Sequence, residues 1–482
     1  MSWSSDCNGI RVCFECISEE YLQKQIIGSN DIFTCDECNN PGNPTIEFDV
    51  LAEMIHVVLE KYYYLTPENP EGYEFFLAKE GAWERSGEML EHLIEDLAGV
   101  SSKLANEIIY HLSNQHDANE KDALYDGQLY SGDPYYAESD IETFPLSESW
   151  RNFKNTIYQE ARFFNEQAKT ILDDIFKGVG SVKTPEGGSV IRTITEEVVF
   201  YRSRVALSNQ SLEEILKNLP SSIGPPNSEI AGTGRMNAQG ISVFYGALDK
   251  ATCLAEVRAP VGSHVVTGRF SPVRKMRLLD LSRMQDARFE TGSAFNEEHM
   301  KSVARLHFLR ELTRELSAPV MPGSESREYL PTQVVAEYLA VHPALKLDGL
   351  IFNSSQTPAV KDANNSELGK NVLLFYRASS LREYDHPRGM KIDVTLTCGN
   401  QNDCDDSITI YEELPKPDVV RGNSEKTHKE DIFDTFNRGE NIINTLVDSS
   451  IQLDMDSVEV DGINGVEYHF NNRQVSRHRE IH

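Results

Sequence analysis

Apolar residues recur at helical spacing through the first part of the chain. Phe48, Leu51, Ile55 and Leu59 lie three or four residues apart, which predicts an amphipathic helix. The same pattern predicts helices near 88–97, along 104–112 and, as one long element, near 148–176. The acidic, turn-rich stretch 118–145 is expected to be a loop or a flexible insert. Together these segments predict a helical domain over 45–178.

Short β-rich runs alternate with helices after residue 191. Strands are expected at 198–204, 243–245, 263–270, 276–281, 350–354 and 372–376, and helices at 211–217, 297–316 and 332–341. Asp249 is the expected N-cap of a further helix, which carries Cys253 and Glu256. The pattern predicts a mixed, largely antiparallel α+β domain over 192–384, preceded by a glycine-rich linker at 179–191. Residues 385–482 are expected to be an acidic C-terminal extension, with short strands at 458–460 and 466–470.

Charge is distributed unevenly along the chain. The 482 residues include 46 lysines and arginines against 76 aspartates and glutamates, a net charge of −30. Residues 1–191 hold 13 basic and 35 acidic residues and 379–482 hold 11 and 21, whereas 192–378 hold 22 and 20. The acidity argues against chain-wide binding of nucleic acid, but the nearly neutral middle region tolerates an anionic small ligand. Because no apolar run reaches the length of a membrane span or of a secretory signal, we expect no membrane partner and a cytoplasmic location.

Four of the eight cysteines form two CxxC motifs, Cys13 with Cys16 and Cys35 with Cys38. This spacing suits four thiolates around a tetrahedral Zn²⁺ ion, and a disulfide is disfavoured in a reducing compartment. We therefore predict a structural zinc ribbon over 1–44, with ordinary thiols as the alternative. Four thiolate ligands leave no open coordination position, which argues against zinc catalysis.

Arg85 and His92 are seven residues apart, which is about two helical turns and would place both on one helical face. An Arg and a His in this arrangement stabilise phosphate and transfer protons in HEPN ribonucleases. Ser86 departs from the amide or carboxylate residue that usually follows the Arg. Since an exposed Arg and His on a helix are far more common than a nuclease pair, RNA cleavage is kept only as an alternative.

Five polar residues of the middle region stand at the edges of predicted strands or helices: Arg202, Arg235, Tyr245, Glu256 and Ser354. The glycine-rich loop 232–240 matches neither a P-loop nor the dinucleotide-binding fingerprint, and no HExxH motif is present. Arginines suit phosphate oxygens, an aromatic ring suits a cationic ring, and a carboxylate stabilises an oxocarbenium-like centre. The set would therefore suit a pyrophosphate ligand that carries a cationic ring.

The order of the motifs FYR, GxGRxNxxGxxxFY, LAEV and LDGLIFNSS resembles the RES domain, a bacterial family named for its Arg, Glu and Ser. The resemblance extends over 192–384 and places Arg202, Arg235, Tyr245, Glu256 and Ser354 at the family's motif positions. It implies a fold similar to that of ADP-ribosyltransferases. It also implies an enzyme that cleaves the nicotinamide–ribose bond of NAD, by hydrolysis or phosphorolysis, and that acts as a toxin or defence effector.

The resemblance also implies a role for each of these residues. Arg202 and Arg235 would bind the pyrophosphate, and Tyr245 would position the nicotinamide. Glu256 would engage the ribose hydroxyls and stabilise the oxocarbenium charge, and Ser354 would fix substrate or catalytic groups through hydrogen bonds. The acceptor would be water, phosphate or a macromolecule.

Residues 45–178 resemble the HEPN-like domain that precedes some RES domains, which implies a sensor, regulatory or assembly module. The expected architecture is therefore multidomain: a zinc ribbon, an all-α HEPN-like domain and an α+β RES domain with an ADP-ribosyltransferase-like mixed sheet. The implied partners are an antitoxin or regulatory protein and a second copy of the chain in a homodimer. Two further alternatives stay open, an ADP-ribosyltransferase that modifies a macromolecule and a non-catalytic zinc-ribbon protein that senses a nucleotide.

Overall fold

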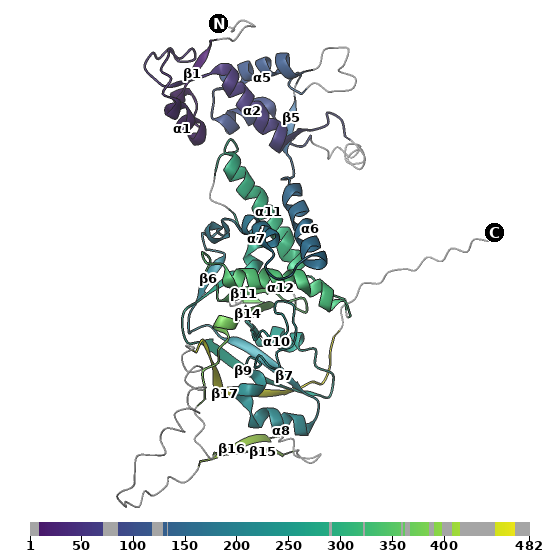
Figure 1. Ribbon diagram of the computed structural model, residues 1–482. Coiled ribbons are helices and arrows are strands. Elements are labelled where there is room, and N and C mark those ends of the chain that lie inside the picture. The colour runs from purple at the N-terminus through teal and green to yellow at the C-terminus, as the bar shows by residue number, and fades with distance from the viewer. Residues whose placement is uncertain are drawn as a thin grey trace, which may run out of the picture. The chain divides into compact units, whose positions relative to one another are not determined.

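Two units make up the part of the chain that the computed structural model describes (Figure 1). The described residues are 9–70, 85–117, 129–132, 134–288, 292–321, 323–357, 360–361, 367–384, 390–397, 407–414 and 449–467. The N-terminal unit comprises residues 1–150 and 288–309, and the C-terminal unit comprises 151–287 and 310–482. None of the described helices is both long enough and apolar enough to cross a lipid bilayer.

The N-terminal unit is built mainly of helices, which confirms the prediction from apolar spacing. They are α1 (Glu20–Ser29), α2 (Phe48–Tyr62), α4 (Leu90–Ala98) and α5 (Ser102–His116). Phe48, Leu51 and Ile55 of α2 and Leu104 of α5 are each 0% exposed and lie in one hydrophobic core. The Ser101 side chain accepts a hydrogen bond from the Leu104 N–H at 3.2 Å and caps α5, because the first N–H groups of a helix have no partner within it.

Short strands accompany these helices. The strand β1 (Arg11–Cys13) pairs antiparallel with β2 (Thr45–Glu47), and β5 (Tyr135–Glu138) lies between β3 (Tyr63–Leu65) and β4 (Glu88–Met89). The strand β5 falls inside 118–145, for which the sequence predicts a loop, so that prediction is wrong at 135–138. Residues 118–128 and 133 of the same stretch lie outside the described residues.

The single helix predicted near 148–176 is wrong, because the structure has two helices there. They are α6 (Phe144–Gln159) and α7 (Glu166–Ile175). Phe164, which the apolar period places on the buried stripe, has a φ of 55° and is 101% exposed. Asn165 then starts α7 as its N-cap, since its side chain accepts a hydrogen bond from the Ala168 N–H at 2.9 Å.

Two histidines and a tyrosine form a polar contact at the edge of the N-terminal core. The His56 Nδ1 lies 2.7 Å from the Tyr130 hydroxyl, and the rings of His56 and His116 are stacked with centroids 3.7 Å apart. Burial, followed by the nearby His116, lowers the pKa of His56, while the carboxylates of Glu53 and Glu60 act in the opposite direction. Protonating His56 in the folded protein therefore costs more than protonating it in the unfolded chain.

We expect the thermal stability of the N-terminal unit to fall as the pH drops from about 7.5 to about 5.5. Because the pKa of His56 is lower in the folded state, the unfolded chain binds more protons below the ordinary histidine pKa of about 6.5. The stabilisation that neutral His56 contributes to the folded state is complete above that value and is lost as the pH falls toward the pKa of His56 in the folded protein. Thermal unfolding at both pH values should show a smaller loss for His56→Gln than for the wild type. The control is His92→Gln, because the side chain of His92 is 60% exposed. If His92→Gln reduced the pH-dependent loss of stability as much as His56→Gln does, the assignment to His56 would be contradicted.

The C-terminal unit contains an eight-stranded sheet, and among its described strands only β10 and β11 are parallel neighbours. In order across the sheet, the strands are β17 (Ile451–Gly462), β9 (His264–Pro272), β7 (Phe200–Ala206), β8 (Phe244–Ala247), β14 (Lys370–Leu374), β11 (Gly349–Asn353), β10 (Met276–Asp280) and β6 (Ile191–Ile194). This arrangement confirms the predicted mixed, largely antiparallel sheet.

Helices cover this sheet, with α8 and α10 on opposite sides of it in Figure 1. The helices of this region are α7, α8 (Asn209–Lys217), α9 (Leu219–Ile223), α10 (Lys250–Glu256), α11 (Glu297–Ser317) and α12 (Glu325–Val341). The division between the two units passes through α6 and α11. Phe200 and Phe244 of the sheet and Leu212 of α8 lie in one hydrophobic core.

The C-terminal segment contributes to this sheet. The strand at 372–376, predicted as the last before the extension, is followed by β15 (Lys391–Thr397), β16 (Ser407–Glu413) and β17. The strand β17 pairs antiparallel with β9 at one edge of the sheet and contains the predicted strand 458–460. Of the strand predicted at 466–470, residues 466–467 are not in a strand and 468–470 lie outside the described residues.

Candidate functional site

A cavity of about 480 Å³ opens beside the middle strands of the eight-stranded sheet, a volume typical of small-molecule sites. Four of the five residues predicted from the sequence line it: Arg202, Arg235, Tyr245 and Glu256. Ser354 reaches the same place through a hydrogen bond to Glu256, and its neighbour Ser355 lines the cavity. Segments separated by more than 150 residues in sequence are therefore brought together at one site.

Strand alternation explains why apolar and polar residues of the sheet separate here. On β8, Phe244 lies in the core while the next residue, Tyr245, lines the cavity. On β14, Val372 lies in the core while the preceding residue, Asn371, lines the cavity. Successive side chains of a strand point to opposite faces, so one face of these strands packs against the core and the other carries the site.

Glu256 is the last residue of α10, whose start is held by Asp249. The Asp249 carboxylate accepts a hydrogen bond from the Thr252 N–H at 2.8 Å, which confirms the predicted N-cap. The Glu256 Oε1 atom accepts hydrogen bonds from the Ser354 hydroxyl at 2.6 Å and from the Asn371 Nδ2 at 2.7 Å. Its other oxygen, Oε2, has no hydrogen-bond partner among the described residues. Two donors thus hold one oxygen and leave the other for a ligand.

Asn371 is a site residue that sequence reasoning missed. It is 9% exposed and lies on β14, directly opposite Phe352 of β11. An asparagine directly before the apolar run Val372–Leu374 is the available signal, because a buried amide requires a hydrogen-bond partner. Its partner, Glu256, is 115 residues away in sequence and lies on a helix, so only the tertiary structure reveals the contact.

The Tyr245 hydroxyl is held by the glycine-rich loop. It accepts a hydrogen bond from the Met236 N–H at 3.0 Å and donates one to the Asn237 Oδ1 at 3.0 Å. Burial raises the pKa of Tyr245 to about 12, so the phenol stays neutral at pH 7. A Cβ atom on Gly234 would lie 2.9 Å from this hydroxyl, which explains a glycine at this position of the loop. With its hydroxyl engaged, Tyr245 can offer its ring to a ligand.

Both predicted arginines make structural contacts within the protein. Arg202 donates a hydrogen bond to the Tyr245 carbonyl at 2.9 Å, and Arg235 donates one to the Leu316 carbonyl at 2.9 Å. Burial, followed by the charge of Arg204, lowers the pKa of Arg202 to about 10. Arg202 therefore still carries a full positive charge at pH 7.

Cys253 also lines the cavity, and its burial argues against a role as a nucleophile. Its Sγ lies 3.1 Å from the Ser203 hydroxyl, and burial raises the pKa of the thiol to about 11. The thiolate is the reactive form of cysteine, and almost none is present at pH 7. The chemistry of this cavity therefore depends on the carboxylate and the arginines.

Replacing Ser354 with alanine is expected to lower kcat for the reaction of this site about 10-fold and to change KM little. The change removes one of the two donors to Glu256 Oε1, and the loss of one positioning hydrogen bond to a charged group has about this effect. Ser355→Ala is the matched control, because Ser355 lines the cavity without a hydrogen bond to Glu256. Steady-state kinetics would contradict this role if both variants lost activity equally or if only KM changed.

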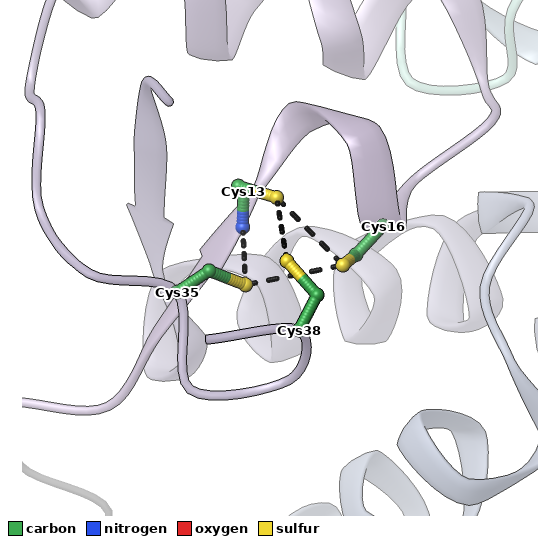
Figure 2. A group of neighbouring side chains, drawn as sticks. All are labelled: Cys13, Cys16, Cys35 and Cys38. Atoms are coloured by element: carbon green, nitrogen blue, oxygen red, sulfur yellow. Dashed lines mark hydrogen bonds between the residues drawn. The ribbon is translucent and has the colours of Figure 1, made fainter. Parts of the chain in front are cut away.

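The four cysteines Cys13, Cys16, Cys35 and Cys38 converge in the N-terminal unit, with their sulfur atoms within 4.8 Å of one another (Figure 2). The Cys13 Sγ lies 3.7 Å from that of Cys16 and 3.6 Å from that of Cys38, and the Sγ atoms of Cys16 and Cys35 are 3.9 Å apart. A tetrahedral ion with Zn–S bonds of about 2.3 Å places its ligands about 3.8 Å from one another. The Cys13 N–H also donates a hydrogen bond to the Cys35 Sγ at 3.2 Å, as expected for a thiolate acceptor. The cluster therefore fits a four-thiolate zinc site.

The helical pairing of Arg85 with His92 is wrong. Arg85 precedes β4, whereas His92 lies on α4, so the two residues do not share a helical face. Arg85 donates to the Thr66 carbonyl at 2.8 Å, and its guanidinium lies 4.7 Å from the centre of the Tyr135 ring. These contacts give Arg85 a structural role beside β3 and β5, so the spacing no longer supports a nuclease pair.

Comparisons with known families match two segments of the chain. The model of the HEPN/RES N-terminal domain 1 matches residues 29–171, and the model of the RES domain matches residues 217–395. Arg235, Tyr245, Glu256 and Ser354 lie within the second match, and Arg202 lies before it. Neither the curated proteins nor the solved structures gave a match to this chain. The chain thus combines a HEPN/RES N-terminal domain, a four-cysteine cluster and a RES domain.

Proposed function

We propose that the C-terminal unit cleaves the nicotinamide–ribose bond of NAD, with water or phosphate as the acceptor. The observation that carries this proposal is Glu256, one oxygen of which is held by Ser354 and Asn371 in a cavity lined by arginines. A fixed carboxylate is suited to a reaction centre that becomes positively charged, and the arginines are suited to an anionic substrate. The RES domain is consistent with an enzyme that acts on NAD.

In this mechanism the bond between the ribose C1′ and the pyridinium nitrogen breaks, and its electron pair leaves with neutral nicotinamide. The leaving group needs no proton, because the substrate ring carries the positive charge. The ring of Tyr245 positions the nicotinamide, and Glu256 Oε2 accepts a hydrogen bond from a ribose hydroxyl and stabilises the oxocarbenium-like centre. Water or phosphate then attacks C1′; attack by water yields ADP-ribose and releases a proton.

The N-terminal cluster has a separate role in this proposal. We infer that Cys13, Cys16, Cys35 and Cys38 bind one zinc ion, which cross-links the segments before and after α1. Four sulfur ligands complete a tetrahedral shell, so the ion supplies stability and no chemistry. Destruction of NAD would further make the protein a toxin or defence effector, as the resemblance to the RES domain implies.

Purified full-length protein incubated with NAD is expected to release nicotinamide, detected by chromatography. In phosphate-free buffer the second product should be ADP-ribose, and in phosphate buffer a phosphorylated ADP-ribose should appear if phosphate is the acceptor. Absence of nicotinamide under both conditions would contradict the proposal. NAD binding without release would favour the sensor alternative, and transfer of labelled ADP-ribose to a protein or nucleic acid would favour the transferase alternative.

A further inference from the structure

A third arginine, Arg258, lines the cavity that contains Glu256. The sequence motifs single out Arg202 and Arg235 and pass over Arg258, which follows Glu256 by two residues. With three arginines and one glutamate, the charged residues that line the cavity have a net charge of +2. This charge favours a ligand with two negative charges close together, such as a pyrophosphate.

The three guanidinium groups differ in how far the protein already uses them. Arg202 donates to the Tyr245 carbonyl, and Arg235 donates to the Leu316 carbonyl and lies 5.8 Å from the centre of the Tyr329 ring. The guanidinium of Arg258 makes no hydrogen bond, ion pair or ring contact with the residues that the structure describes. Its forked donors are therefore the ones most available to a ligand.

The backbone at Arg258 supports the same conclusion independently. The helix α10 ends at Glu256, and two residues later Arg258 adopts a left-handed conformation with a φ of 48°. This position after a helix is usually occupied by glycine, because a Cβ atom makes the left-handed conformation unfavourable. Arg258 is solvent-exposed and lines the cavity from a left-handed position where glycine would be more stable, so the lining of the cavity, together with this conformation, suggests that its side chain is required.

We propose that Arg258 is the principal ligand of the substrate pyrophosphate at this site, and that Arg202 and Arg235 mainly shape the cavity and its positive field. The inference rests on the proposed function and deepens it, because it assigns the contact with the pyrophosphate of NAD to Arg258. Arg258 directly follows the helix that carries Glu256, so binding of the pyrophosphate would align the ribose with the carboxylate.

The test compares Arg258→Gly with the wild-type full-length protein. Titration calorimetry with inorganic pyrophosphate is expected to show at least about 10-fold weaker binding for the variant, as expected for the loss of a forked contact to phosphate. KM for NAD in phosphate-free buffer should rise by a similar factor, with a smaller change in kcat. The melting temperature should stay the same or rise by about 2–4 °C, because glycine relieves the left-handed strain. Arg258→Lys should recover part of the binding, since it restores the charge without the fork.

Lys346→Gly is the matched control, because Lys346 is an exposed cation with the same φ of 48° and does not line this cavity. It should share the stability change and bind pyrophosphate like the wild type.

The proposal is wrong if the wild type binds no pyrophosphate, if Arg258→Gly binds it normally, or if Lys346→Gly loses binding equally. It is also wrong if Arg258→Gly affects only the stimulation by orthophosphate, since Arg258 would then bind the acceptor. Failure of the proposed function is distinct from these outcomes, because it would appear as wild-type protein that binds pyrophosphate and releases no nicotinamide.

Discussion

Replacing Glu256 with glutamine is expected to lower kcat for nicotinamide release by at least about 100-fold, the usual effect of removing one group that stabilises transition-state charge. The glutamine carbonyl can still accept the hydrogen bonds from Ser354 and Asn371, so the fold and the shape of the cavity should be retained. What is lost is the negative charge opposite the oxocarbenium-like centre and the Oε2 acceptor, since the glutamine Nε2 in its place can only donate a hydrogen bond to the ribose hydroxyl. Because one hydrogen bond to the ribose can still form, we expect the affinity for NAD to change much less than kcat.

Steady-state kinetics, NAD binding by calorimetry and a thermal melt would together test this expectation. The control is Glu214→Gln, an exposed carboxylate on α8 that does not line the cavity. Glu214→Gln should match the wild type in all three measurements. If Glu256→Gln kept more than half of the wild-type kcat, the carboxylate would not be the group that stabilises the transition state. A large fall in the melting temperature would instead show that Glu256 is needed for folding.

Removing the metal from the N-terminal cluster is expected to destabilise the N-terminal unit strongly. Structural zinc contributes on the order of 10 kcal/mol of binding free energy at neutral pH, which is comparable to the whole stability of a domain. Burial raises the pKa values of Cys13 and Cys16, so these thiols would take up protons when the metal is removed. The link that the metal makes between the segments before and after α1 would then be lost. We expect about one zinc ion per chain, and we expect chelation to expose the amides of residues 9–47 to hydrogen exchange.

Cys16→Ser, compared with Cys7→Ser, tests this assignment. Cys16 is one of the four converging cysteines, whereas Cys7 is not one of the predicted ligands and lies outside the described residues. Elemental analysis should show zinc lost from the first variant and kept in the second, together with a lower melting temperature for the first only. A wild-type protein that is folded and free of metal would refute the zinc site.

Local sequence signals predicted most elements of this fold. The apolar spacing in α2 and α5 and the N-cap Asp249 depend on residues within one or two turns, so they are legible without any tertiary contact. The prediction of one helix at 148–176 was wrong because apolar spacing continues across a break. Asn165 caps a new helix there, and Phe164 lies in solvent.

Only part of the candidate site could be predicted from the sequence. Arg202, Arg235, Tyr245 and Glu256 were found because short motifs surround them, and the structure places all four at one cavity. Asn371 was missed, since its only signal is a polar residue in a buried strand. Arg258 was also missed, because the information that sets it apart is a positive φ and the absence of a partner among the described residues.

The sequence by itself therefore determined most element types, the two CxxC pairs and most of the residues able to carry out the proposed chemistry, because these are encoded by spacing and residue type. Only the tertiary structure decided which groups meet. Packing of α10 against β14 brings Glu256 to Asn371 across 115 residues, and β17 from the acidic tail pairs with β9. Such contacts depend on which helices and strands become neighbours, and residue spacing along the chain carries little information about that choice.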